Sequence, residues 1–152
     1  MSVSPKLVAL LGVITLAAVA WFTLSGGSSS EPAGDVASVH SRYEKAAATI
    51  IAKGSSVHAS PDLNAFNATC TASLSTMAKE VQAFSGLAKD ESGQTATIAT
   101  QTRDAAQRGL DAATAYCSAL GRSRLADAKR AQEQLDTATQ DLNSQIKAWE
   151  QS

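Results

Sequence analysis

The sequence predicts an all-α protein: an N-terminal single transmembrane (or signal) helix followed by an antiparallel up-down-up-down four-helix bundle. Three observations predict this fold class. Residues 7–24 are apolar and carry no charge. Beyond residue 34, apolar residues recur at spacings of three and four, which is typical of amphipathic helices. The same stretch lacks alternating β-branched runs joined by hairpin turns, so we expect no strands.

The charge balance of the chain excludes one class of partner. The 152 residues carry a formal net charge of −1. Of the 13 Lys and Arg residues only Lys6 precedes the apolar segment, and all 14 acidic residues follow it. A nearly neutral domain gives no support for nucleic-acid binding or for a polybasic membrane patch. We therefore expect a membrane contact through residues 7–24 and no nucleic-acid partner.

The apolar segment fits a membrane span. Residues 7–24 read LVALLGVITLAAVAWFTL. As a helix they would be roughly 27 Å long, close to the hydrocarbon thickness of a bilayer. Lys6 precedes the segment and Glu31 follows it, so the positive-inside rule predicts an N-in/C-out orientation in a bacterial-type inner membrane. The domain would then lie in the periplasm or an equivalent extracytoplasmic space. The alternative is cleavage near Ala20, which would release a secreted domain.

The rest of the chain divides into a tether and a helical domain. After the anchor or signal segment 1–24, residues 25–34 read SGGSSSEPAG, and this composition predicts a flexible linker to the domain 35–152. The four helices are predicted over residues 35–57, 61–89, 94–120 and 123–150. The predicted caps are Asp35 for the first helix, Ser60 before Pro61 for the second, and Gly121 at the end of the third.

The break between the last two helices follows from the apolar phase. Continuing the third helix in register would turn Arg124 inward, whereas the apolar series resumes at Leu125 and Ala128. This one-residue slip beside Gly121 predicts two helices. The alternative is one bent helix, which would suit a phage-type coiled-coil spanning protein.

The two cysteines predict a disulfide. Cys70 and Cys117 each lie on the apolar stripe of a helix, and their midpoint falls at the predicted turn around Gly93. Residues equidistant from the turn of an antiparallel hairpin face each other, and an extracytoplasmic compartment permits oxidation. The pair is not a C-x-x-C motif, so we expect a structural role.

Residues with catalytic or metal-binding chemistry are sparse. His40 and His58 would lie roughly 27 Å apart along one helix and could not share a metal, so we interpret both as solvated. Glu80 and Asp104 are interpreted as solvated helix surface. We therefore expect no enzyme activity, no catalytic residue, no metal site and no cofactor.

Three functional hypotheses remain, and the sequence leaves the oligomeric state open. The favoured one is a non-enzymatic protein-protein interaction or assembly module of the cell envelope, with another envelope protein as its partner. The second is a periplasmic inhibitor or immunity protein, which an exposed acidic or aromatic patch would favour. The third is a small-ligand sensor, for which Tyr43, Tyr116 and Trp149 are the first residues to inspect. A basic cluster is the possible partner surface: Arg122, Arg124, Lys129 and Arg130.

Overall fold

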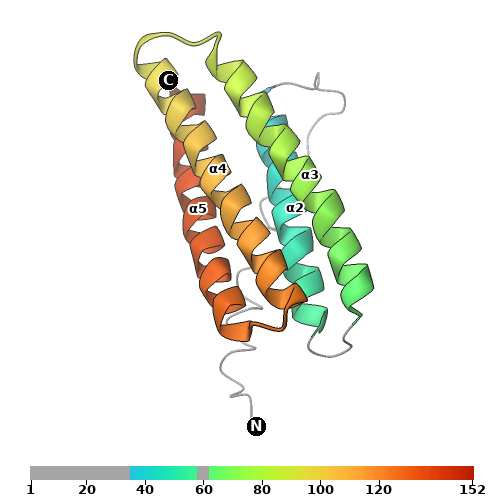
Figure 1. Ribbon diagram of the computed structural model, residues 1–152. Coiled ribbons are helices and arrows are strands. Elements are labelled where there is room, and N and C mark those ends of the chain that lie inside the picture. The colour runs from blue at the N-terminus through green and yellow to red at the C-terminus, as the bar shows by residue number, and fades with distance from the viewer. Residues whose placement is uncertain (1–34, 58–61) are drawn as a thin grey trace. The chain divides into compact units, whose positions relative to one another are not determined.

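The computed structural model describes residues 35–57 and 62–152 as a bundle of helices (Figure 1). The helices are α2 (Val36–Val57), α3 (Leu63–Ala88), α4 (Gly93–Gly121) and α5 (Leu125–Gln151). Successive helices run in opposite directions, and these residues contain no strand, as predicted. None of the four helices combines the length and apolarity that a bilayer crossing needs. The predicted membrane segment 7–24 and the tether lie outside the described residues.

Of the two predicted helix N-caps, the one for α2 is confirmed and the one for α3 is wrong. Asp35 caps α2 as expected, and its Oδ1 accepts a hydrogen bond from the Ser38 N–H at 2.7 Å. In α3 the cap is Asp62, whose Oδ1 accepts from the Ala65 N–H at 3.0 Å. The predicted cap at Ser60 is therefore wrong, because a carboxylate two residues further along supplies the acceptor that the first turn needs.

The α4–α5 connection confirms that these are two separate helices. The helix α4 ends at Gly121, but the residue in the left-handed backbone region is Ser123, with φ 58°. The predicted glycine cap is thus wrong in position, and a serine takes the conformation usually reserved for glycine. The Ser123 N–H donates to the Leu120 carbonyl at 3.0 Å, and the Arg124 N–H donates to the Ala119 carbonyl at 2.8 Å.

The core follows the predicted stripes, with one exception. Alanines from α2, α4 and α5 make up much of the buried surface, and a few large side chains fill the space between them. The largest fully buried apolar side chains are Tyr43, Phe66, Phe84, Ile50, Met77 and Leu142. Leu125 was expected to join this core but is 57% exposed. It is the first residue of α5, directly after the turn at the end of the bundle.

Two tyrosines of the core each fill a space that a glycine on another helix leaves open. The Tyr43 hydroxyl of α2 lies against Gly109 of α4 and donates to the Ala106 carbonyl at 2.7 Å. In the reciprocal contact, the Tyr116 ring of α4 lies against Gly54 of α2. A Cβ at either glycine would overlap the tyrosine. These contacts let α2 and α4, which are parallel and diagonal in the bundle, approach closely.

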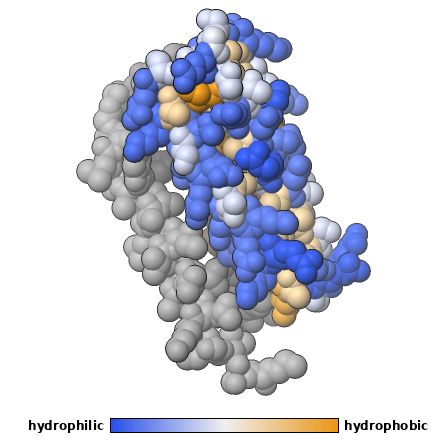
Figure 2. Space-filling model, turned by 90° about the vertical axis from the view of Figure 1, so that its left-hand side faces the viewer, coloured by the Kyte–Doolittle hydropathy of each residue, from blue (hydrophilic) through white to orange (hydrophobic). Residues whose placement is uncertain are grey.

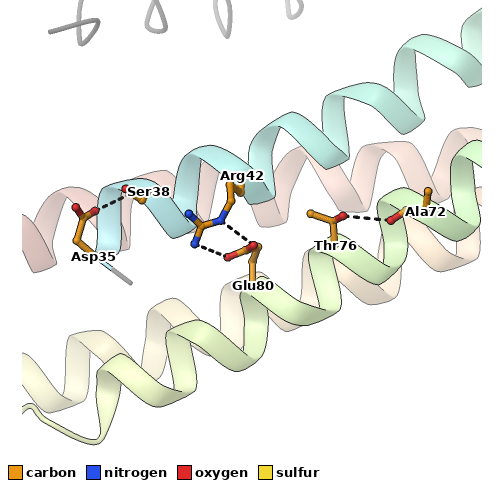
Figure 3. A network of polar contacts seen from close by, with 6 residues as sticks. All are labelled: Asp35, Ser38, Arg42, Ala72, Thr76 and Glu80. Carbon is orange, nitrogen blue, oxygen red and sulfur yellow. Dashed lines mark hydrogen bonds and ion pairs between the residues drawn. The ribbon is translucent and has the colours of Figure 1, made fainter. Parts of the chain in front are cut away.

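An ion pair between a partly exposed arginine and a buried glutamate joins α2 to α3 (Figure 3). The Arg42 guanidinium donates two hydrogen bonds to the Glu80 carboxylate, at 2.9 and 3.1 Å. The Glu80 side chain is 4% exposed and the Arg42 side chain 42% exposed. Glu80 was interpreted as solvated surface, and this is wrong, because it lies between Met77 and Phe84 on the inward face of α3. The two hydrogen bonds from Arg42 offset the cost of burying the Glu80 charge.

The predicted disulfide between Cys70 and Cys117 is confirmed, with a Cα–Cα distance of 6.1 Å. It joins the first half of α3 to the last turns of α4. At the other end of the bundle, the Trp149 indole N–H donates to the Glu91 carboxylate at 3.0 Å and its ring packs beside Phe84. The last turns of α5 are thereby attached to the α3–α4 turn.

The tyrosine–glycine contacts predict a specific pattern of substitution effects. Gly109→Ala should lower the free energy of unfolding by ~1–3 kcal/mol because the core becomes overpacked. Adding Tyr43→Phe should recover part of this loss, since the hydroxyl is the atom that the new Cβ meets most closely. Adding Tyr116→Phe to Gly54→Ala should recover less, because ring carbons of Tyr116 also clash there. Urea denaturation followed by circular dichroism measures each pair as a double-mutant cycle.

The matched control is Gly86→Ala on the exposed face of α3, where an added Cβ meets nothing within 4 Å. This variant should gain up to ~1 kcal/mol from helix propensity alone. Equal effects at positions 54, 86 and 109 would contradict the close approach of α2 and α4.

The disulfide predicts a large difference in stability between the oxidised and reduced chain. The crosslinked cysteines are 47 residues apart, and the chain-entropy model gives about 4 kcal/mol for such a loop. Reduction by dithiothreitol should lower the urea midpoint of the native chain accordingly. The double variant Cys70→Ala/Cys117→Ala should be insensitive to the reductant. A native midpoint that reduction leaves unchanged would show that the crosslink adds no stability.

Candidate functional site at the α4–α5 corner

The predicted basic cluster forms an exposed surface where α4 turns into α5. We call this surface the α4–α5 corner. All of its members are exposed. They are Arg122, Arg124, Leu125, Lys129 and Arg130. In the bundle this corner lies at the end opposite the start of α2 and the α3–α4 turn (Figure 1).

The corner residues do not all face the same way. Arg122 and Arg124 line one small notch of about 190 Å³, together with Asp127 and residues of the last turns of α4. Arg130 lines a separate open groove of about 470 Å³ between α4 and α5. Its guanidinium also lies 3.9 Å from the Asp127 carboxylate. The structure thus brings Arg122 and Arg124 together around one depression and directs Arg130 to another.

The lining of the notch is mixed. Two alanines and a serine contribute from α4, and two arginines and one aspartate supply charge: Ala115, Ser118, Ala119, Arg122, Arg124 and Asp127. Leu125 follows Arg124 directly and projects into solvent at the first turn of α5. The corner therefore combines a notch that Arg122 and Arg124 line with an exposed apolar side chain, Leu125. The sequence did not indicate that Leu125 belongs to the exposed corner, because its spacing fits the apolar stripe that packs in the core.

The backbone beneath the corner is held in place from two sides. Cys117 lies one turn before Gly121 and fixes this end of α4 to α3 through the disulfide. Gly121 itself lies against α3, where an added Cβ would be 3.3 Å from the Asn67 Oδ1. The turn is further ordered by the hydrogen bonds that end α4. We therefore expect the two arginines and Leu125 to be presented on a rigid support.

The surrounding surface is mostly hydrophilic. Figure 2 shows the side of the molecule on which α4 and α5 lie in Figure 1, and apolar residues appear there only as small separate spots. In the groove between these helices the charges alternate, since Arg108 and Arg130 face three acidic residues, and Arg108 lies 3.4 Å from Asp141. Such mixed charge lacks the single-sign field that would attract an ionic ligand.

His40 was interpreted as solvated, but the structure places it in a polar contact between α2 and α5. Its Nε2 lies 2.7 Å from the Asn143 Oδ1 and 3.2 Å from the Glu44 Oε1. Burial lowers the pKa of the ring, but the hydrogen bonds to Glu44 and Asn143 and the charges of Glu44 and Glu150 outweigh it. The net result is a raised pKa. His58 lies outside the described residues.

The three aromatic residues named for a ligand sensor are packed into the bundle. Tyr43 and Trp149 have the hydrogen-bond partners described above, and the Tyr116 ring meets Phe66 edge to face at 6.4 Å. Burial raises the pKa of Tyr116 to about 12. None of the three lines the notch at the corner or the groove between α4 and α5. Every aromatic side chain in residues 35–57 and 62–152 is buried, so this part of the chain presents no aromatic patch.

Acidic, histidine and cysteine side chains are not gathered into a metal-binding group of three or more anywhere in the described part of the chain. Comparison of the chain with protein-family models, with curated proteins and with solved structures gave no match.

The contact of His40 predicts a pH-dependent stability. Because its folded-state pKa is raised, the stabilisation is fully present below the unfolded pKa of ~6.5 and is lost as the pH rises through the folded value. Between pH 5.5 and 8.0 the native chain should therefore lose stability, and His40→Gln should reduce that loss. Urea denaturation at a series of pH values measures it. Gln82→His, on the exposed face of α3, provides a control for an added solvated histidine. An unchanged pH profile in His40→Gln would contradict the contact.

Proposed function

We propose that the chain is a non-enzymatic, membrane-anchored extracytoplasmic protein that acts as an interaction or assembly module in the cell envelope. Residues 7–24 serve as its anchor in a bacterial-type inner membrane, with the N-terminus inside. The α4–α5 corner is its docking surface for another envelope protein.

The observation that carries this proposal is the composition of the corner. An apolar side chain that is 57% exposed stands beside two arginines at a turn that a disulfide supports. Arginine is enriched in the energetically important centres of protein interfaces, and a rigid backbone reduces the entropy lost on binding. A single exposed leucine would mean little by itself. Together with the arginine-lined notch, it gives the chain a surface suited to a protein partner.

The order of the elements along the chain supports the same assignment. The helix α2, which follows the predicted tether, begins at one end of the bundle, and the α4–α5 turn lies at the other end (Figure 1). The helix α4 has 29 residues and is roughly 43 Å long. A domain attached to the membrane through its first helix would thus present the corner away from the point of attachment.

The alternatives are an inhibitor or immunity protein and a small-ligand sensor. An inhibitor of this kind would use an exposed acidic or aromatic patch, and a sensor would use a cavity beside Tyr43, Tyr116 or Trp149. The described aromatic side chains are buried, neither depression is lined by these three residues, and the α4–α5 corner is basic and apolar. We therefore favour the interaction module.

Site-specific photo-crosslinking in native membranes tests the proposal. A photoreactive phenylalanine analogue replaces Leu125 in the full chain, and matched controls carry it at the exposed positions Gln82 on α3 and Lys89 at the opposite end of the bundle. We expect one discrete adduct from position 125 and none from the two controls. The chain should also stay in the membrane fraction after alkaline carbonate extraction. Extraction into the soluble fraction, or adducts that do not depend on position, would contradict the proposal.

A further inference from the structure

We infer that the α4–α5 corner recognises an acidic protein segment, which places a carboxylate at the Arg122 and Arg124 notch and an apolar pocket over Leu125. This inference rests on the proposed function and adds the chemistry of the partner. It follows from the shape of the corner, its charge and the exposure of Leu125.

The charge at the notch selects an anionic group. Arg122 and Arg124 both line it, and Asp127 is the acidic residue there. Arg130 lies within 3.9 Å of Asp127 and offsets its charge. Among the described residues no ion pair holds Arg122 or Arg124, so both can pair with an incoming group. Guanidinium groups form paired hydrogen bonds with carboxylates, and a depression of about 190 Å³ has room for a side chain of that size.

The combination of a charged notch and an exposed leucine favours a protein segment over a lipid surface as the partner. Leu125 is 57% exposed at the first residue of α5, and it follows in sequence Arg124, which lines the depression. A protein partner can contact both features, with one acidic side chain at the arginines and an adjacent apolar pocket around Leu125. Of the four cations, Arg130 lies 3.9 Å from Asp127 and lines a separate groove, so the corner lacks the cluster of about four to eight unopposed basic residues that anionic lipid selects. The acidic segment is thus the occupant that fits both features.

The test uses the full chain in nanodiscs of zwitterionic lipid and a peptide probe of alternating glutamate and leucine. Nuclear magnetic resonance shift changes at the corner report binding of the peptide. Substituting glutamine for its glutamates should abolish binding, and substituting serine for its leucines should weaken it. The double variant Arg122→Glu/Arg124→Glu should lose affinity about tenfold or more, and Leu125→Ser roughly fivefold.

The matched control is Lys45→Glu/Lys89→Glu, which makes the same change in net charge at exposed positions away from the corner. Its affinity should stay within about twofold of the native chain. Equal losses in the two charge-reversed variants would overturn the inference in favour of general charge attraction. Binding of phosphatidylglycerol vesicles through the corner, without binding of the peptide, would overturn it in favour of anionic lipid.

The crosslinking assay in native membranes separates this inference from the proposed function. If position 125 still gives its adduct when Arg122 and Arg124 are glutamates, the corner is a docking surface but the partner is not acidic. If the native corner gives no adduct at all, the proposed function itself fails. Because all three substituted side chains are exposed, the variants should keep the thermal unfolding midpoint of the native chain.

Discussion

The close approach of α2 and α4 across the centre of the bundle is the constraint on which the rest of the fold depends. An alanine-rich interior offers little volume, so the helices must come near each other to exclude water. Tyr43 and Tyr116 supply large side chains, and Gly109 and Gly54 supply the space for them. Each contact joins the diagonal helices α2 and α4. The distance between these two helices in turn sets the positions of α3 and α5, which pack on either side of them. A methyl group at either glycine would force these helices apart.

Around this centre the pairs of helices are joined by different chemistry. A disulfide joins α3 to α4, and the Arg42–Glu80 ion pair joins α2 to α3. Between α2 and α5, which share the least extensive contact of the neighbouring pairs, His40 and Asn143 form a polar bridge. A covalent bond is insensitive to pH and salt, whereas a histidine contact is not. Near neutral pH, where histidine titrates, we therefore expect the α2–α5 contact to respond to a change in pH.

The sequence could predict the helices and the disulfide because both depend on local periodicity and on equal distances from a turn. It could not predict that Glu80 is buried, because the partner that permits this, Arg42, lies on another helix 38 residues away. The signal was present, since Glu80 falls on the core stripe between apolar neighbours. The exposure of Leu125 was hidden for the opposite reason. Its spacing fits the core, but it lies at the end of the bundle, where its side chain is exposed.

The same reasoning explains why the corner could be predicted as a group of residues but not as a shape. Arg122 and Arg124 are neighbours in sequence, so their cluster is visible without a structure. The left-handed backbone at Ser123 separates the two helices, and the resulting turn brings both arginines to one notch while Arg130 faces another. The disulfide at Cys117 anchors the helix that carries this turn. A bond predicted for stability thus also determines how firmly the proposed docking surface is presented to a partner.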